Sequence, residues 1–357
     1  MILDMQELVM FLTCYPRLYQ QPYSMHLLLD NCMFGRQMEA ETVINFVLYT
    51  QPHGAEELLD VLPIVGPGGV GKSTLVSHVL KDERVCNHFS EILFSHDCGF
   101  TDDELAVSFR QVCAARNHQN HASNSNKDGR SLVVVELAGD FNEDAWNRLY
   151  SASKRSMPTG SKIIVTSRSE NITRFGTTRA LCLDHLSHET YWYLFKTLAF
   201  GSMHPEAYPR HMHLAMEIAS SMNRCFISAI ITARLLRDNF DIHFWYKVMA
   251  CLRGFIQTHV SSFGEHPFDL VVQNRPARFG RMGAPSEYFM IYKNFQLSSD
   301  EEVPELRIQD LMYGSVKPYG KFEILIWQSH ILPYHSYVAT CEIQEQKIAT
   351  SKRKRSA

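Results

Sequence analysis

The sequence lacks long apolar runs, and none of its cysteines form a C-x-x-C pair. No apolar run approaches the roughly 20 residues needed to span a bilayer, and Asp4 and Glu7 stand where a secretory signal would be basic. The nine cysteines are an odd number scattered over 357 residues, a usage typical of reduced thiols in the cytoplasm or nucleus. The sequence therefore predicts a soluble protein that is neither secreted nor membrane-spanning, without disulfides or structural zinc.

An excess of charge of one sign is also missing. The 35 Lys and Arg residues nearly balance 38 Asp and Glu residues, and the net charge of -3 excludes a nucleic-acid-binding surface along the whole chain. The basic tail at 351–357 is the exception, with the run KRKR at 352–355. This tail fits a nuclear-import signal or a weak contact with nucleic acid or an acidic surface, and it equally fits a solvated, frayed chain end.

Against this background the segment 61–76 stands out, because it reads as a buried strand, a glycine-rich turn and the start of a helix. The turn has the form G-x-x-x-x-G-K-[ST], which predicts a loop whose backbone amides surround the phosphates of a nucleotide. Lys72 is expected to reach the β- and γ-phosphates, and the Ser73 hydroxyl is expected to ligate Mg²⁺. The predicted nucleotide-binding residues of this loop are Gly66, Gly68, Gly69, Val70, Gly71, Lys72, Ser73 and Thr74.

Two further strand patterns end in charged residues. The apolar run 132–135 is typical of a parallel strand covered on both faces, and it ends in Glu136, a candidate Mg²⁺ ligand or simply an acid that ends a strand. The segment 160–168 ends in Arg168. Since the carboxyl ends of parallel strands converge on the ligand, Arg168 is expected either to approach a γ-phosphate or to be an ordinary exposed arginine.

The order of elements predicts an α/β fold in which a parallel P-loop NTPase sheet has flanking helices. Strands alternate with helices up to about residue 183, including a strand at 89–95 and a helix at 101–115. Helical patterns follow at 187–198, 211–221, 226–237 and 242–255, and two strands at 321–328 and 336–343 suggest a hairpin. The expected divisions are an N-terminal extension (1–30), a nucleotide-binding domain (31–183), a helical domain (184–255), a poorly defined C-terminal region (256–350) and the basic tail (351–357).

Taken together, the motifs resemble the NB-ARC module of plant disease-resistance proteins, which belong to the STAND class of P-loop NTPases. The stretches that carry the likeness are Phe34-Gly35-Arg36, the loop 66–74, the strand 132–136 and the strand 160–168. Residues 235–239 and 244–245 also resemble the family's helical ARC1 region. The likeness extends over roughly residues 31–252.

The resemblance implies a nucleotide switch. By resemblance, Phe34, Gly35 and Arg36 lie near the adenine, the phosphate loop holds ADP or ATP with Mg²⁺, and Arg168 senses the γ-phosphate. The family alternates between an ADP-bound resting state and an ATP-bound state that assembles. Arg168 would then shift the equilibrium through its contact with the additional phosphate.

The sequence also departs from the family pattern. The family's paired acids correspond here to Glu136 and Leu137, so the second carboxylate, which would orient or deprotonate the attacking water, is absent. We therefore expect at most a slow ATPase. The family's Gly-Leu-Pro-Leu motif corresponds to residues 225–228 without the proline, and its Met-His-Asp motif has only a faint echo at 308–310. No coiled-coil, TIR or leucine-rich pattern is recognisable, which implies a reduced member of the family.

Two functions follow from this comparison. The first is an ADP/ATP-binding switch in plant defence, and the alternative is a nucleotide-independent interaction or decoy partner of full-length resistance proteins. The expected partners are a nucleotide and other immune-receptor proteins, with no membrane span and with nucleic acid reached only through the basic tail. The expected location is the cytoplasm, and the tail leaves nuclear import open.

Overall fold

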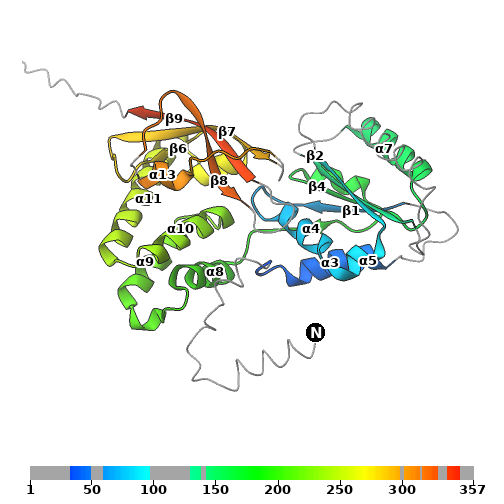
Figure 1. Ribbon diagram of the computed structural model, residues 1–357, viewed down its shortest axis with the longest axis horizontal. Coiled ribbons are helices and arrows are strands. Elements are labelled where there is room, and N and C mark those ends of the chain that lie inside the picture. The colour runs from blue at the N-terminus through cyan, green and yellow to red at the C-terminus, as the bar shows by residue number, and fades with distance from the viewer. Residues whose placement is uncertain are drawn as a thin grey trace, which may run out of the picture. The chain divides into compact units, whose positions relative to one another are not determined.

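The computed structural model describes residues 33–49, 59–96, 129–137, 142–297, 301–313, 316–328 and 336–345 (Figure 1). These residues fall into two compact units, the first ending at Leu186 and the second beginning at Ser187. The helix expected at 101–115, the N-terminal extension and the basic tail lie outside the described residues.

The first unit is built on a parallel sheet. Its strands are β1 (Asp60–Val65), β2 (Glu91–His96), β3 (Ser131–Leu137), β4 (Lys162–Ser167) and β5 (Leu181–Cys182). Their order across the sheet is β2-β3-β4-β1-β5, and every pairing is parallel. Strand β4 thus lies between β1, which enters the glycine-rich loop, and β3, which carries Glu136. The parallel sheet predicted from the apolar runs is confirmed.

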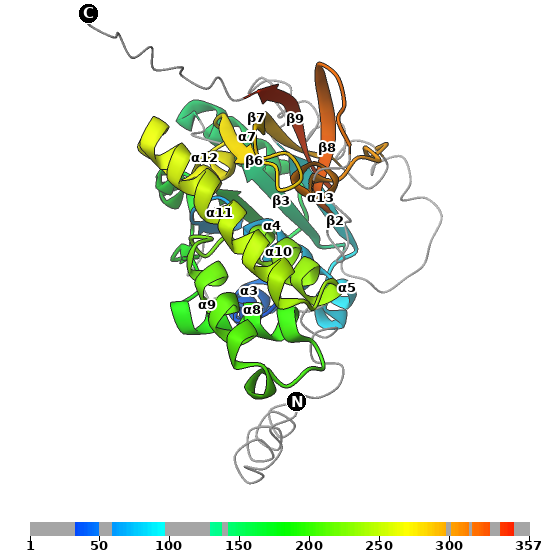
Figure 2. The ribbon, with the colours of Figure 1, turned by 90° about the vertical axis from the view of Figure 1, so that its left-hand side faces the viewer.

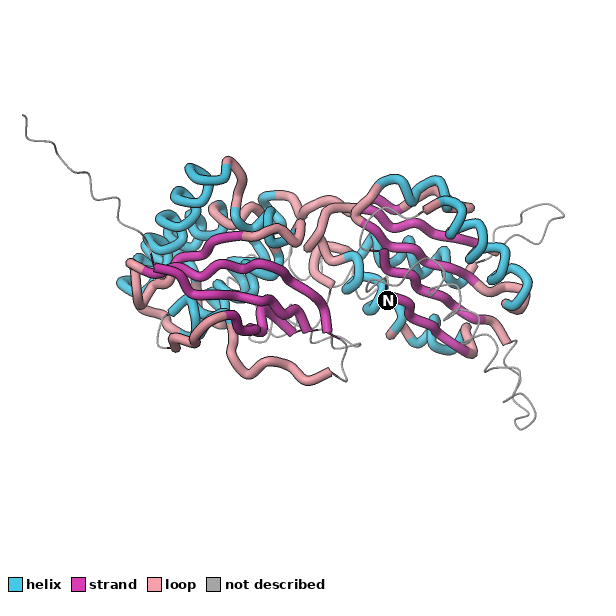
Figure 3. The backbone as a smooth tube through the Cα atoms, turned by 90° about the horizontal axis from the view of Figure 1, so that it is seen from above, coloured by secondary structure: helices cyan, strands magenta, loops and turns pink. Residues whose placement is uncertain are grey.

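Helices cover both faces of this sheet (Figures 1 and 3). They are α3 (Gln37–Leu48), α4 (Lys72–Leu80), α5 (Glu83–His88), α7 (Glu143–Ser156) and the 3₁₀ helix η1 (Glu170–Phe175). Alternate residues of β3 enter separate cores: Val134 packs with residues of α3 and α4, whereas Val135 packs with α7 and η1. The continuous apolar sequence of the strand follows from this two-sided burial.

A buried lysine attaches α3 to the amino-terminal edge of the sheet. Lys162 is 1% exposed, and its Nζ donates to the carbonyl oxygens of Phe46 at 2.5 Å and Tyr49 at 2.7 Å. The carboxylate of Asp60 lies 3.4 Å from the same nitrogen. Burial lowers the pKa of Lys162, and Asp60 opposes that shift. The lysine thereby satisfies carbonyls at the carboxyl end of α3 that have no helical partner.

The second unit begins with helices. They are α8 (His188–Phe200), the 3₁₀ helix η2 (Pro205–Ala207), α9 (Pro209–Ser220), α10 (Phe226–Asp238), α11 (Ile242–Phe263) and α12 (Pro267–Val272). Trp245 of α11 is fully buried against Phe200 and Phe240, and its ring nitrogen donates to the carbonyl oxygen of Leu236 at 2.9 Å. The long helix α11 packs against α9 and continues toward the second sheet (Figure 2).

The second unit ends in an antiparallel sheet with the strand order β6-β7-β9-β8. Its strands are β6 (Ala277–Gly280), β7 (Glu287–Leu297), β8 (Lys321–Gln328) and β9 (Ser336–Glu345), with helix α13 (Ile308–Tyr313) between β7 and β8. The hairpin predicted at 321–328 and 336–343 is confirmed as β8 and β9. The other two strands were missed, because β7 contains the consecutive apolar run 288–292 instead of the alternation typical of a half-buried strand.

Within the part of the chain that the structure describes, no helix is both long enough and apolar enough to cross a membrane.

Candidate functional site

The glycine-rich segment forms a loop between β1 and α4 at the carboxyl edge of the parallel sheet. Strand β1 ends at Val65, and α4 begins at Lys72 after Gly71, which has a φ of 94° at the helix N-cap position. Side chains rarely adopt this left-handed conformation, so the sharp entry into the helix depends on glycine here. The local sequence therefore produces the strand, turn and helix that the motif requires.

The loop presents amides that the protein itself leaves without partners. Residues 68–69 form a turn, and among the described residues no acceptor is bonded to the backbone N–H groups of Gly69 and Gly71 on either side of Val70. These groups precede the amino-terminal end of α4, where the helix dipole is positive. Such an arrangement favours an anion, and a phosphate group is the usual one at a loop of this type.

Lys72 folds back over the same loop. Its Nζ donates to the carbonyl oxygens of Gly66 at 2.7 Å and Pro67 at 2.8 Å, and the residue is 9% exposed. Burial and then the positive charge of Arg168 lower the pKa of Lys72 from 10.5 to about 8, while Glu136 opposes the shift. The lysine is therefore a buried cation whose charged form an added anion would stabilise.

Ser73 and Glu136 meet beside the loop, although 63 residues separate them in the sequence. The Ser73 hydroxyl donates to Oε1 of Glu136, which lies at the end of β3. A hydroxyl and a carboxylate are hard oxygen donors of the kind that Mg²⁺ accepts, so the pair fits the magnesium site expected from the sequence. Within the described residues, no group of three or more His, Cys, Asp or Glu side chains could hold a metal.

Leu137 points away from this pair. It is 3% exposed and packs with Val135 and Trp146 in the core on the opposite face of the sheet. Successive side chains of a strand alternate between faces, so position 137 is on the far side from Ser73. Leu137 thus extends the apolar core beneath α7.

Arg168 follows β4 directly, and its side chain is exposed. Because β4 lies between β1 and β3, this position is at the carboxyl edge between the loop and Glu136. Its charge is close enough to lower the pKa of Lys72. The structure therefore places Arg168 at the same edge of the sheet as Lys72, Ser73 and Glu136, and its approach to a γ-phosphate stays a prediction.

The segment Phe34-Gly35-Arg36 forms a turn at the start of α3, with a φ of 69° at Gly35. The guanidinium of Arg36 is directed at protein groups. Its Nη1 donates to Oε1 of Glu39 at 3.0 Å, and its Nη2 donates to the carbonyl oxygens of Val70, at 3.4 Å, and Asp184. Phe34 is half-buried. The proximity of these three residues to an adenine stays a prediction.

The segment at 183–184 was missed by sequence reasoning, because a short connection without periodicity carries no local signal. The Leu183 amide donates to the carbonyl oxygen of Val65 at 2.8 Å. A Cβ atom at Gly66 would lie only 2.1 Å from the Leu183 carbonyl oxygen. Gly66 is therefore needed because this segment runs directly against the start of the loop.

The motif positions of the second unit have structural roles of their own. The carbonyl oxygen of Cys225, which precedes α10, accepts a hydrogen bond from the Tyr191 hydroxyl at 3.0 Å. The carboxylate of Asp310 in α13 accepts one from the Arg307 amide at 2.9 Å. These bonds account for Cys225 and Asp310 as local structural residues.

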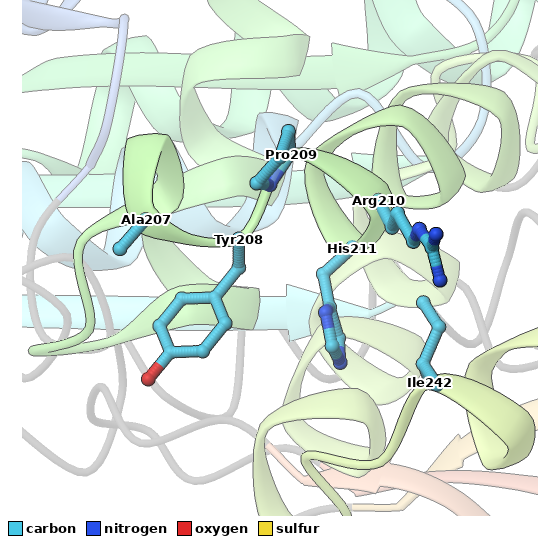
Figure 4. A pocket seen from close by; sticks show the side chains of 6 residues that line it. All are labelled: Ala207, Tyr208, Pro209, Arg210, His211 and Ile242. Carbon is cyan, nitrogen blue, oxygen red and sulfur yellow. The ribbon is translucent and has the colours of Figure 1, made fainter.

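The second unit also contains a pocket of about 290 Å³ (Figure 4). The residues lining it are Ala207, Tyr208, Pro209, Arg210, His211 and Ile242. The His211 ring stacks on Phe240 with centroids 4.5 Å apart, and burial lowers the pKa of His211. This lining contains no carboxylate and no glycine, so the pocket lacks the magnesium ligands and the glycine-rich turn of the loop in the first unit.

Comparison with known proteins identifies a family match in the region that carries the loop. Residues 41–204 match the model of the NB-ARC domain. The chain is 28% identical over 180 residues to disease resistance protein RGA2 of Solanum bulbocastanum, an alignment that covers 47% of this chain and 18% of that protein. It is 22% identical over 265 residues to putative disease resistance protein At1g50180 of Arabidopsis thaliana, covering 69% of this chain and 30% of that protein.

The chain thus spans between about a fifth and a third of the length of these curated relatives. Solved structures with some similarity include Caenorhabditis elegans PCH-2, with a TM-score of 0.39, 12% identity and coverage of 60% of this chain and 67% of that chain. Drosophila ORC bound to DNA has a TM-score of 0.32 and 10% identity, covering 57% of this chain and 60% of that chain.

Proposed function

Because the chain carries an NB-ARC domain like that of plant disease-resistance proteins, as its motifs predicted, we propose that it is an ADP- and ATP-binding switch in plant defence. The observation that supports this most directly is the phosphate loop itself. The amides of Gly69 and Gly71, which have no acceptor among the described residues, lie beside a buried lysine at the positive end of a helix. We further propose that the protein acts in the cytoplasm with other immune-receptor proteins.

In this proposal different residues of the first unit bind different parts of the nucleotide and its metal ion. The amides of Gly69, Val70 and Gly71 receive the diphosphate, and Lys72 exchanges its bonds to loop carbonyls for bonds to phosphate oxygens. Ser73 and Glu136 would hold Mg²⁺, which would neutralise phosphate charge when bound. Each of these groups is already at the carboxyl edge of the sheet, where parallel α/β proteins bind their ligands.

Arg168 provides the distinction between the two nucleotides. A ligand shifts a conformational equilibrium only if it interacts differently with the two states. The exposed guanidinium at the end of β4 is free to reach an additional phosphate, and ATP offers one more such group than ADP. We therefore assign the sensing of the γ-phosphate to Arg168.

We propose that hydrolysis is slow. An efficient site needs a group that orients or deprotonates the attacking water. Glu136 is bonded to Ser73, and position 137 faces the opposite core, so a side chain there does not reach the water whatever its type. The switch is then reset mainly by exchange of nucleotide.

The test is nucleotide binding by the purified chain. Nucleotide released on denaturation is identified by chromatography, and ADP affinity is measured by calorimetry for the wild type and for Lys72→Ala. Lys81→Ala is the matched control, since it removes an exposed ammonium from the other end of the same helix. Loss of two charge-assisted hydrogen bonds predicts a deficit of about 3 kcal/mol, or roughly 100-fold, for Lys72→Ala alone.

Equal ADP affinity of the wild type and Lys72→Ala would refute the assignment of the loop. A wild type that binds neither ADP nor ATP would refute the switch and would favour the nucleotide-independent interaction partner.

A further inference from the structure

We propose that Arg36 is a positioning residue that fixes the Val70–Gly71 peptide in the orientation that binds phosphate, instead of contacting the base of the nucleotide. The inference rests on the proposed function, because it concerns how the phosphate loop is prepared for its ligand. It assigns to Arg36 a contribution to phosphate affinity that does not depend on the nucleoside.

The first support is the environment of the guanidinium. Arg36 is 4% exposed, and a single nitrogen, Nη2, bridges the carbonyl oxygens of Val70 and Asp184. The neighbouring Nη1 is held by Glu39 at 3.0 Å. Burial of a cation is unfavourable unless hydrogen bonds compensate it, and these acceptors hold Nη1 and Nη2, whereas Nε is buried without a partner among the described residues. Its described donor bonds go to the loop, to the 183–184 segment and to its own helix.

The second support comes from the geometry of the peptide bond. A trans peptide is planar, so the carbonyl of Val70 and the N–H of Gly71 point in opposite directions. With the carbonyl directed toward Arg36, the Gly71 amide is directed away from it, and this amide has no acceptor among the described residues. Arg36 thereby orients a donor without touching the anion that the donor binds.

Removal of the guanidinium would release this constraint. Val70 is 1% exposed, so its carbonyl would be left buried without that partner. Gly71, at φ 94°, has the conformational freedom to let the peptide rotate. Rotation would bring a carbonyl oxygen toward the phosphate in place of an N–H group, and the interaction would change from attractive to repulsive.

Arginine suits this task better than lysine. Its planar guanidinium presents separate nitrogens to Glu39 and to the two carbonyls, whereas an ammonium is a single point donor. Arg36 also precedes α3, and Lys162 binds carbonyls at the far end of that helix. The guanidinium is therefore supported by an element that is itself attached to the sheet.

The experiment compares two ligands, ADP and inorganic pyrophosphate, because pyrophosphate has no base. Calorimetry is carried out on the wild type, Arg36→Gln, Arg36→Lys and the control Glu39→Gln, which keeps both bonds of Nη2. We expect Arg36→Gln to weaken both ligands by a similar factor of about ten, the effect of one charged hydrogen bond. Arg36→Lys should lose less for both ligands, and Glu39→Gln should stay within about threefold of the wild type.

Thermal unfolding of each variant establishes that titrations are performed on folded protein. If Arg36→Gln does not fold, the comparison is made with Arg36→Lys, for which parallel losses are again expected. A variant that loses ADP affinity but keeps full pyrophosphate affinity would overturn the proposal in favour of contact with the base. A wild type that binds neither ligand would instead overturn the proposed function, so the two failures are distinguishable.

Discussion

Nucleotide binding should be coupled to uptake of a proton by Lys72 at alkaline pH. In the ligand-free protein, burial and Arg168 lower the pKa of this lysine to about 8. A bound diphosphate places negative charge beside the ammonium and favours its charged form, which raises the pKa again. Binding therefore takes up protons wherever the free lysine is partly neutral, and affinity must fall as the pH rises above about 8.

The size of the effect follows from the lowered pKa. The change from 10.5 to about 8 means that the fold disfavours the charged lysine by about 3 kcal/mol. About half of the free protein is neutral at Lys72 at pH 8 and about nine-tenths at pH 9, so binding takes up about 0.5 and 0.9 proton respectively. Above pH 8 the affinity for ADP should approach a tenfold loss per pH unit.

Calorimetry in two buffers with different ionisation enthalpies measures this uptake directly. The terminal phosphate of ADP is already ionised in this range, so it contributes little. Cys182 is exposed in the strand beside β1, and Cys182→Ser is the control variant, which should keep the uptake. Equal heats in both buffers, with constant affinity from pH 7.5 to 9, would refute the assignment of Lys72 to the phosphates.

The remaining predictions concern stability, measured by chemical denaturation. Gly66→Ala should lower the free energy of unfolding by about 3 kcal/mol, because its Cβ would lie 2.1 Å from the Leu183 carbonyl oxygen. Gly254→Ala should raise the free energy of unfolding by about 0.5–1 kcal/mol, because the Cβ would enter open space beside α11. An unchanged stability of Gly66→Ala would contradict the packing of the 183–184 segment. Leu137→Asp should lower stability by about 3–5 kcal/mol without increasing ATPase activity, and a stable, faster variant would show that position 137 reaches the nucleotide.

The sequence was informative wherever the signal is local. The glycine spacing of the loop and the apolar runs of β1, β3 and β4 predicted the parallel sheet, because strands buried on both faces leave a continuous apolar pattern. The strand β5 has only two residues, too few to show any period. The contact of Leu183, which follows β5, with Gly66 is a product of packing, which the sequence pattern does not contain.

Helix boundaries show a second limit of sequence reasoning. The helix expected to end at 255 continues to Phe263, and Gly254 is one of its interior residues. The glycine that ends this helix is Gly264, which has a φ of 76° at the C-cap. Glycine favours a helix end only where the backbone turns left-handed, and that conformation is not visible in the residue type.

The contacts of Arg36 could not be inferred from the sequence, because 148 residues separate it from Asp184. A motif can identify such an arginine, but the acceptors it meets depend on how the strands are ordered. The pairing of Ser73 with Glu136 is likewise a product of the order β3-β4-β1.

Helix α3 is fastened at both ends by cations, Arg36 at the first turn and Lys162 at the last. Its 12 residues give it a length of about 18 Å, and this length sets the distance between its two attachment points on the sheet. Exchange of a solvent-facing side chain such as Met38, which is 81% exposed, leaves that length intact. Insertion or deletion of a single residue would rotate one end by about 100° relative to the other, so evolution or design can vary the composition of this helix far more freely than its length.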